Sequence, residues 1–80
     1  MIWSHVEVDW CKEWNCWTVG GYDSQGNRES LSEHHRKEWA VDEAMIYAFD
    51  TSCGLQRAAK VDVYTKTGKL IKTITEGEAK

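Results

Sequence analysis

The chain has 80 residues, enough for one domain but close to the size at which a single core supplies only about 3 to 5 kcal/mol of net stability. Most large apolar side chains are therefore needed for packing, and few are left to line a deep pocket. Hydrophobic residues at 41% and charged residues at 29% exclude an intrinsically disordered chain. The formal net charge of -3 argues against a protein whose main task is to grip nucleic-acid phosphates, because that task requires a basic surface.

The charge is unevenly distributed along the chain. Residues 1–55 contain ten acidic and four basic residues, whereas residues 56–80 contain six basic and three acidic residues. The sequence therefore predicts an acidic region and a milder basic one. A mixed, solvated surface is the simpler interpretation, and an acidic face that docks on a basic partner is the sharper one.

Two features bear on the cellular compartment. Residues 1–10 lack the basic start and continuous apolar stretch of a signal peptide, and no apolar run approaches the length of a membrane span. Cys11, Cys16 and Cys53 form an odd count, which fits reduced thiols better than a disulfide framework, although a cross-strand bond between Cys11 and Cys16 stays open. We expect a cytoplasmic protein that does not contact membranes.

The first part of the chain has the period of β-structure. Residues 2–10 alternate, with one side formed by Val6, Val8 and Trp10 and the other by His5, Glu7 and Asp9. Residues 16–23 resume the alternation after a short hairpin. The glycines at positions 20 and 21 predict a bulge or the close approach of another backbone or of the helix. After the SQGN turn, residues 28–32 could pair as a third strand.

The main helix is predicted over residues 41–54. Its apolar face consists of Val41, Ala44, Met45, Ala48, Ser52 and Leu55, flanked by Ile46, Phe49 and Cys53. The opposite face consists of Glu43, Tyr47 and Asp50. Gly54 supplies a left-handed C-cap. Residues 30–39 predict a strand end, a turn or a short helical turn, followed by the main helix from about Trp39 or Ala40.

The last part of the chain predicts a hairpin. Val61 and Val63 alternate with polar neighbours, Gly68 supplies positive φ in the turn, and residues 70–74 form the return strand. Residues 76–80 should be loose. We therefore expect residues 1–80 to form one compact α+β domain, in which an antiparallel sheet of three to five strands has one main helix packed on one face, in ββαββ-like order.

Candidate chemistry is sparse. Cys11 and Cys16 flank a four-residue turn, and with Cys53 and His34 or His35 they could offer a mixed zinc site. The signal is weak, because the side chains of adjacent histidines diverge on most backbones. No nucleophile with an oxyanion site, phosphate loop, dinucleotide fingerprint or paired-carboxylate signature is present. We expect no enzyme, no cofactor and no bound metal.

The tryptophans are more informative. Trp10 and Trp17 are predicted to form the floor under the helix, because aromatic side chains dominate small cores. Trp14 lies at a hairpin tip among polar residues and has little to bury against. Since tryptophan is enriched where interfaces concentrate their binding energy, Trp14 is predicted to anchor a partner.

Three short motifs carry a family resemblance. The W-x-V strand of residues 17–19, the E-A-(hydrophobic)2-x-A helix of residues 43–48 and the V-x-V strand with a G-K-L-I hairpin in residues 61–71 resemble the small ββαββ domains of unknown function of bacteria and their phages. In size and element order the chain is also similar to some anti-CRISPR inhibitors, small phage proteins that bind Cas subunits and block target DNA. The resemblance covers roughly residues 5–75, and the SEHHRKEW segment departs from it. It carries over no functional residue.

Two functions stay open. The first is a non-catalytic inhibitor or adaptor, encoded by a phage or mobile element, that acts as a monomer or homodimer and blocks a basic, nucleic-acid-handling protein such as a Cas effector. The second is a nucleic-acid-binding domain that uses the basic C-terminal hairpin, Lys66, Lys69 and Lys72, with Tyr64. The residues expected to contact a protein partner are Glu7, Asp9, Glu13, Trp14, Glu33, Glu38, Asp42, Glu43, Tyr47 and Asp50.

Overall fold

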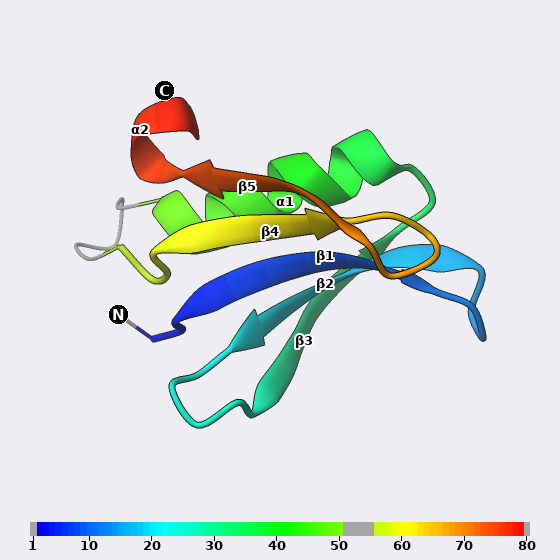
Figure 1. Cartoon of the computed structure of the whole chain (residues 1–80), viewed down its shortest axis with the longest axis horizontal. Coiled ribbons are helices and arrows are strands. Elements are labelled where there is room, and N and C mark those ends of the chain that lie inside the picture. The colour runs from blue at the N-terminus through cyan, green and yellow to red at the C-terminus, as the bar shows by residue number, and fades with distance from the viewer. Residues whose placement is uncertain (1, 51–55, 80) are drawn as a thin grey trace.

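The computed structural model describes residues 2–50 and 56–79, and it confirms the α+β class (Figure 1). The strands are β1 (His5–Cys11), β2 (Cys16–Tyr22), β3 (Arg28–His34), β4 (Lys60–Tyr64) and β5 (Leu70–Thr75). The helices are α1 (Lys37–Phe49) and α2 (Glu76–Ala79). Residues 76–79, which we expected to be loose, thus form α2. Within the described residues, no helix combines the length and apolar character that crossing a bilayer requires.

The five strands form one sheet in the order β3-β2-β1-β4-β5. Neighbouring strands are antiparallel except for β1 and β4, which lie side by side at the centre and run parallel. The prediction of a purely antiparallel sheet is therefore wrong, and the sheet is mixed. The hairpin of β4 and β5 is confirmed, with Gly68 at a φ of 87° in its turn.

The third strand is the reason for the mixed sheet. Because β3 is a full strand of seven residues, three strands precede α1, and β3 runs in the same direction as β1. The helix then carries the chain back along one face, so that β4 starts in the direction of β3 and β1. Figure 1 shows α1 behind the sheet, with β4 placed beside β1.

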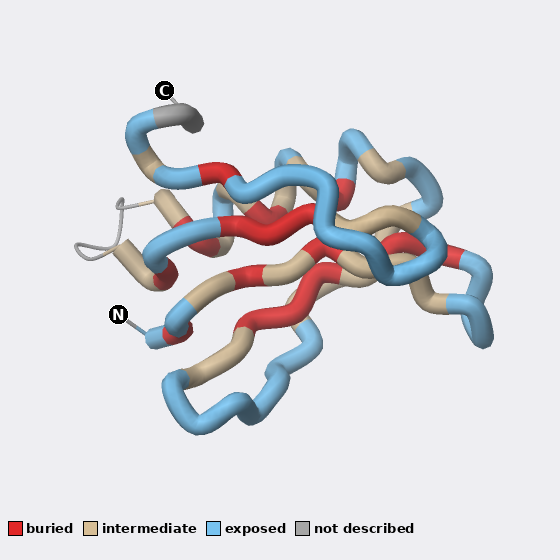
Figure 2. Tube along the Cα trace, in the orientation of Figure 1, coloured by how far each residue is buried: buried red, intermediate tan, exposed pale blue. Residues whose placement is uncertain are grey.

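The core lies between α1 and one face of the sheet. Val6, Val8, Val19 and Val61 are fully buried there, and Ala40, Ala44 and Ala48 of the helix face them (Figure 2). Three alanines four residues apart give the helix a narrow, smooth stripe, which lets it approach the valines closely. Trp17 is buried in this core and Trp10 packs against its margin, as the floor prediction required.

The helix differs from its prediction in position and in orientation. It begins at Lys37, shortly after β3 ends at His34, and it ends at Phe49, with Asp50 extended, whereas the prediction placed it over residues 41–54. The predicted positions of Ser52, Gly54 and Leu55 lie outside the described residues.

The orientation of α1 differs from the prediction at two residues, one expected beside the apolar face and one expected on the opposite face. Centring the stripe on Ala40, Ala44 and Ala48 turns Ile46 outward, where it is 52% exposed. The same rotation turns Tyr47 inward, against the prediction: its ring packs edge-on against Trp3, and its hydroxyl donates to the Leu31 carbonyl at 3.2 Å.

Gly20 and Gly21 fulfil the prediction of an irregular, closely approached strand. The pairing of β2 with β3 shifts register between Val19 and Gly20. A Cβ at Gly21 would lie 2.6 Å from the indole of Trp3, and a Cβ at Gly20 would lie 2.6 Å from the Arg28 guanidinium. Side chains, rather than another backbone or the helix, are therefore what approaches these two glycines.

Candidate functional site

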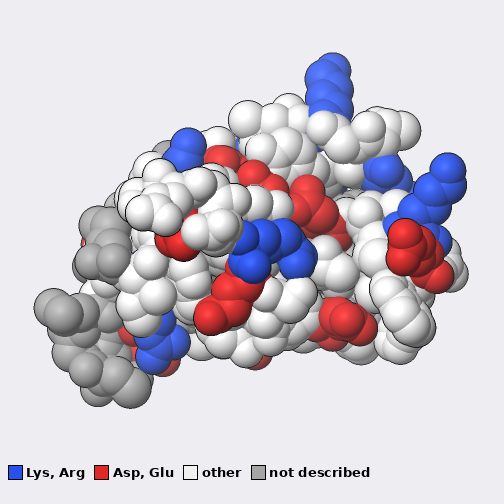
Figure 3. All heavy atoms as spheres, turned by 90° about the horizontal axis from the view of Figure 1, so that it is seen from below, with Lys and Arg blue, Asp and Glu red and all other residues white. Residues whose placement is uncertain are grey.

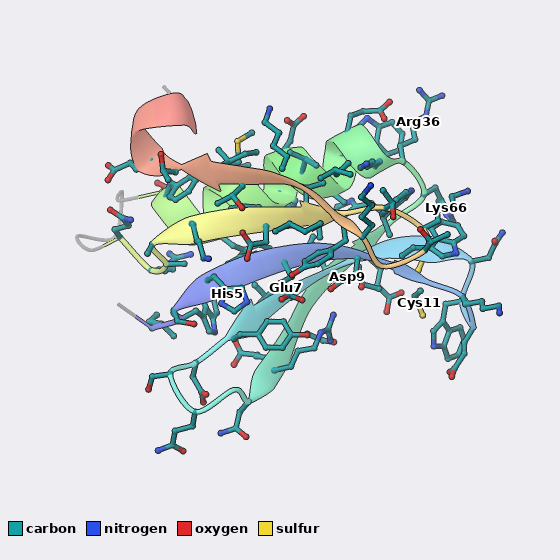
Figure 4. All side chains as sticks on the ribbon, in the orientation of Figure 1. His5, Glu7, Asp9, Cys11, Arg36 and Lys66 are labelled. Atoms are coloured by element: carbon teal, nitrogen blue, oxygen red, sulfur yellow. The ribbon has the colours of Figure 1, made fainter. Side chains whose placement is uncertain are left out.

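The face of the sheet opposite α1 carries most of the polar side chains of the strands, and we call it the open face. Successive side chains of a strand point to opposite faces of the sheet. The neighbours of each buried valine in β1, β2 and β4 therefore point to the open face. Figure 4 shows His5, Glu7 and Asp9 along β1 on this side of the sheet. The open face is formed by His5, Glu7, Asp9, Cys11, Cys16, Thr18, Tyr22, Arg28, Ser30, Glu33, Asp62 and Tyr64.

Glu7 occupies the centre of the open face. Its side chain is only 17% exposed, and its Oε1 atom lies 3.0 Å from Nε2 of His5. The hydroxyl of Tyr64 donates to the same oxygen at 3.4 Å. Across the parallel pair of β1 and β4, Asp62 is the register partner of Glu7. Two carboxylates therefore face each other in the middle of the sheet.

Asp62 is the more deeply buried of these two carboxylates. Its side chain is 8% exposed, and it accepts a hydrogen bond of 2.8 Å from the Thr73 hydroxyl of β5. The ammonium of Lys60 lies 3.6 Å from its other oxygen. A buried carboxylate normally requires such partners, because burying an unpaired charge is costly.

Asp9 extends the carboxylate row towards the first hairpin. Burial, and after it the negative charge of Glu7, raise the pKa of Asp9 to about 6. Arg28 and His5 act in the opposite direction but do not outweigh these two causes. At Asp9, burial and a like charge therefore outweigh the nearby positive charge.

A shallow groove of about 380 Å³ lies where this row meets the hairpin of β1 and β2. Trp14 is 73% exposed at the tip of that hairpin, next to Asn15, whose φ of 52° closes the turn. Asp9, Trp14 and Glu33 line the groove together with Arg28. A smaller hollow beside it shares Trp14 and Glu33.

The predicted contact residues separate into two groups. Glu7, Asp9 and Glu33 share the open face, with Trp14 and the exposed Glu13 at the hairpin tip next to it. The remaining predicted contact residues lie on α1 or at its end: Glu38, Asp42, Glu43, Tyr47 and Asp50. Figure 3, seen from below Figure 1, shows acidic side chains interspersed with basic ones.

The residues on α1 have surroundings of their own. Glu38 and Asp42 line a groove of about 360 Å³ together with Lys37 and Lys72, so positive charge accompanies them. Tyr47 is occupied inside the fold. Among the described residues, none of this group lines the groove at Trp14 or the hollow beside it.

Sequence reasoning did not identify His5 or Asp62 as site residues, and it assigned Tyr64 only to the nucleic-acid-binding alternative. The alternation of β1 already placed His5 beside Glu7, so that signal was present. Asp62 could not be found in this way, because its position beside Glu7 depends on the parallel pairing of β1 with β4.

The mixed cysteine and histidine zinc site is not assembled in the described part of the chain. Cys11 and Cys16 are register partners across the first hairpin and are free thiols, whereas Cys53 lies outside the described residues. Among the described residues, the group of His, Cys, Asp and Glu side chains close enough to hold one ion consists of His5, Glu7 and Asp62.

Comparison of the chain with known protein families, with curated proteins and with solved structures finds no significant match in any of the three.

Proposed function

We propose that the protein is a non-catalytic module that binds a basic surface of another protein and acts as an inhibitor or adaptor. The observation that supports this is the convergence of the exposed Trp14 indole with the carboxylates of Asp9 and Glu33 around one groove. Tryptophan is a frequent anchor of protein interfaces, and neighbouring carboxylates favour a cationic group beside it.

A lysine or arginine side chain of a partner matches this groove. Its cation could stack on Trp14, a contact worth about 0.5 to 2 kcal/mol, and pair with Asp9 or Glu33. Arg28 lies in the same groove, but its guanidinium is occupied: it donates to the hydroxyls of Ser30 at 2.8 Å and Thr18 at 3.4 Å. The charge of Arg28 still acts on Asp9, and a cation from a partner would add to it.

The electrostatics of Asp9 support the same proposal. Its raised pKa reflects burial and the repulsion from Glu7 in the free protein. A cation from a partner would relieve that repulsion, and the pKa of Asp9 would fall on binding. Binding through this groove should therefore weaken as the pH falls below about 6.

The negative charge of the groove favours a partner with a basic surface. Proteins that handle nucleic acids expose lysine and arginine side chains at the positions that bind phosphates, and carboxylates of this module would occupy those positions. A Cas effector is the example offered by the resemblance to anti-CRISPR inhibitors. This partner is part of the proposal.

The nucleic-acid-binding alternative has less support, because two side chains of the basic hairpin are engaged within the fold. The ammonium of Lys66 lies 4.2 Å from the centre of the Trp10 ring, and the hydroxyl of Tyr64 donates to Glu7. Lys72 lines the groove beside α1, where Glu38 and Asp42 accompany it.

The test uses a fluorescently labelled arginine-rich peptide as the probe. Fluorescence anisotropy during titration with the full chain should show binding that weakens as the ionic strength rises. Trp14→Ala and Glu33→Gln should each weaken it by about tenfold or more. Asp42→Asn is the matched control, because it removes one exposed carboxylate from α1, away from the groove, and should leave peptide binding unchanged.

Two outcomes would overturn the proposal. One is equal peptide binding by the wild-type chain, Trp14→Ala and Glu33→Gln. The other is tighter binding of a labelled DNA duplex than of the peptide, which would favour the nucleic-acid alternative.

A further inference from the structure

His5, Glu7 and Asp62 place one imidazole nitrogen and two carboxylates within 4.8 Å of one another on the open face. His5 and Glu7 are two residues apart on β1, so both point to this face, and β4 brings Asp62 beside Glu7. From this geometry we propose that the three side chains form a binding site for a divalent first-row transition-metal ion. The proposal does not depend on the protein-binding function, which uses the groove at Trp14.

The spacing of the ligand atoms fits one ion. Ligands with bonds of about 2.1 Å lie roughly 3.0 Å apart when adjacent and 4.2 Å apart when opposite in an octahedral site. His5 Nε2 and Glu7 Oε1 are 3.0 Å apart, which is the adjacent spacing. No two ligand atoms of the group are more than 4.8 Å apart, which is close to the opposite spacing.

The hydrogen bonds of Ser4 decide which nitrogen of His5 is available. The Ser4 hydroxyl donates its proton to the carbonyl of Tyr22 at 3.0 Å. The same hydroxyl lies 3.0 Å from His5 Nδ1, so this nitrogen is engaged by Ser4 and the Nε2 atom is the one directed at the Glu7 carboxylate.

The Nε2 atom of His5 thus lies 3.0 Å from Oε1 of Glu7. Asp62, whose side chain is only 8% exposed, offers the third ligand atom from the neighbouring strand. The parallel stacking of His5 on Tyr22, with ring centres 5.1 Å apart, holds the imidazole in this orientation.

All three proposed ligands have an outer hydrogen-bond partner. Ser4 holds His5, the Thr73 hydroxyl donates to Asp62 Oδ1 at 2.8 Å, and the Tyr64 hydroxyl donates to Glu7. Partners of this kind orient metal ligands in proteins and fix the tautomer of a ligating histidine. An ion at this position would share Glu7 Oε1 with the Tyr64 hydroxyl and would compete with the Lys60 ammonium for Asp62 Oδ2.

The local charge also favours a cation. Glu7 and Asp62 are directly opposite each other, an arrangement of like charges that destabilises a sheet. Lys60 is the nearby ammonium, 3.6 Å from Asp62 Oδ2, and it compensates only one of the two carboxylates. An ion with two positive charges would compensate both.

The ligand set selects the kind of ion. One imidazole with two carboxylates suits Zn²⁺ or Mn²⁺, whereas Mg²⁺ and Ca²⁺ prefer sites made of oxygen alone. Three protein ligands leave at least one coordination position for water or for a group from another molecule. We commit to Zn²⁺ as the tighter of the two, following the order of affinities of divalent metals.

The experiment is isothermal titration calorimetry of the full, chelator-treated chain with ZnCl₂, and then with MnCl₂ and MgCl₂. We expect one Zn²⁺ per chain, weaker binding of Mn²⁺ and no binding of Mg²⁺. His5→Gln and Asp62→Asn should each weaken Zn²⁺ binding by about tenfold or more. His35→Gln is the matched control, since His35 is exposed and lies outside the group, and it should bind like the wild type.

Further variants separate this site from its alternatives. Lys60→Gln removes the competing ammonium and should strengthen Zn²⁺ binding, a result that a purely structural role of Asp62 would not produce. If Asp62→Asn fails to fold, Mn²⁺-induced broadening of the His5 ring signals in the NMR spectrum of the wild-type chain provides a second readout.

The proposal is overturned if the wild-type chain binds no Zn²⁺. It is equally overturned if binding is lost in Cys11→Ser or Cys16→Ser but kept in His5→Gln, because the thiols would then hold the ion.

Discussion

The indole of Trp3 occupies the space that a side chain at position 21 would need. A Cβ built on Gly21 would lie 2.6 Å from the ring atoms of Trp3, which is itself buried at the end of the core. The indole cannot move away freely, because Tyr47 of α1 packs against its other side with ring centres 6.5 Å apart. Trp3 thus joins β2 to the helix.

Gly21→Ala should therefore destabilise the fold by about 1 to 3 kcal/mol, the cost of forcing extra volume into a packed core. Urea unfolding followed by circular dichroism measures the change. Gly77→Ala is the control: a Cβ there meets nothing within 4 Å, and its backbone needs no positive φ. Equal stability of Gly21→Ala and the wild type would show that Trp3 is not tightly held.

The alanine stripe of α1 allows a second prediction. Ala44 is fully buried against the central valines, so Ala44→Leu should overpack the interface and cost about 1 to 3 kcal/mol. Ile46→Ala, at a position that is 52% exposed, should change the free energy of unfolding by less than about 0.5 kcal/mol. Thermal unfolding of both variants checks the orientation of the helix. A large loss in Ile46→Ala would support the orientation predicted from the sequence instead.

That orientation illustrates what periodicity can and cannot predict. The positions of Val41, Ala44, Met45 and Ala48 towards the core were correct, because any apolar stripe at a helical repeat must contain them. The centre of the stripe was not predictable, because it is formed by Ala40, Ala44 and Ala48, whose small side chains add little to a hydrophobic pattern. Their small size, which allows the close approach, matters only once the valine floor is known. Tyr47 was misplaced for this reason.

The candidate site shows the same division. Local alternation was sufficient to place Glu7 and Asp9 on one face of β1, and a hairpin tip was sufficient to expose Trp14. The pairing of Glu7 with Asp62 depends on a contact between strands far apart in the sequence. Its direction followed from whether residues 28–34 form a strand, which the sequence left open.

Asp9 leads to a prediction on pH dependence. Its pKa in the folded protein, about 6, lies above the ordinary value of 3.8, so between these two pH values the folded state binds more protons than the unfolded state. The free energy of unfolding should therefore fall as the pH rises from about 4 to about 6. Asp9→Asn should remove this slope and raise stability at pH 7 by about 1 kcal/mol, allowing for solvent screening at this half-buried position.

Urea unfolding of the chelator-treated protein at several pH values measures how the free energy of unfolding depends on pH, in the wild type and in Asp9→Asn. Asp23 provides a control of opposite sign, because backbone hydrogen bonds from Asn27 and Gln25 to its carboxylate lower its pKa. Its contribution is present above the ordinary pKa and is lost on acidification, so Asp23→Asn should lower stability at pH 7. If Asp9→Asn were less stable than the wild type at pH 7, the repulsion assigned to Glu7 would be wrong.

Asp9→Asn also separates stability from binding. The same substitution that stabilises the isolated chain should weaken its binding of the arginine-rich peptide, because it removes a carboxylate from the groove at Trp14. A residue kept only for folding would not give opposite effects in the two measurements. A variant with raised stability and unchanged peptide binding would remove Asp9 from the proposed interface.

The two tryptophans of the first hairpin give the sharpest contrast. Trp17 is 7% exposed and packs edge-on against Trp10 with ring centres 5.3 Å apart, so Trp17→Ala should cost about 3 to 5 kcal/mol, much of the stability expected for a domain of this size. Trp14 is 73% exposed, and Trp14→Ala should change the free energy of unfolding by less than about 0.5 kcal/mol. The proposed interface accounts for an exposed side chain of this size beside two carboxylates. Unfolding and peptide-binding measurements on Trp14→Ala decide the matter: unchanged stability with lost binding supports the interface, whereas a loss of stability like that of Trp17→Ala would make Trp14 a structural residue.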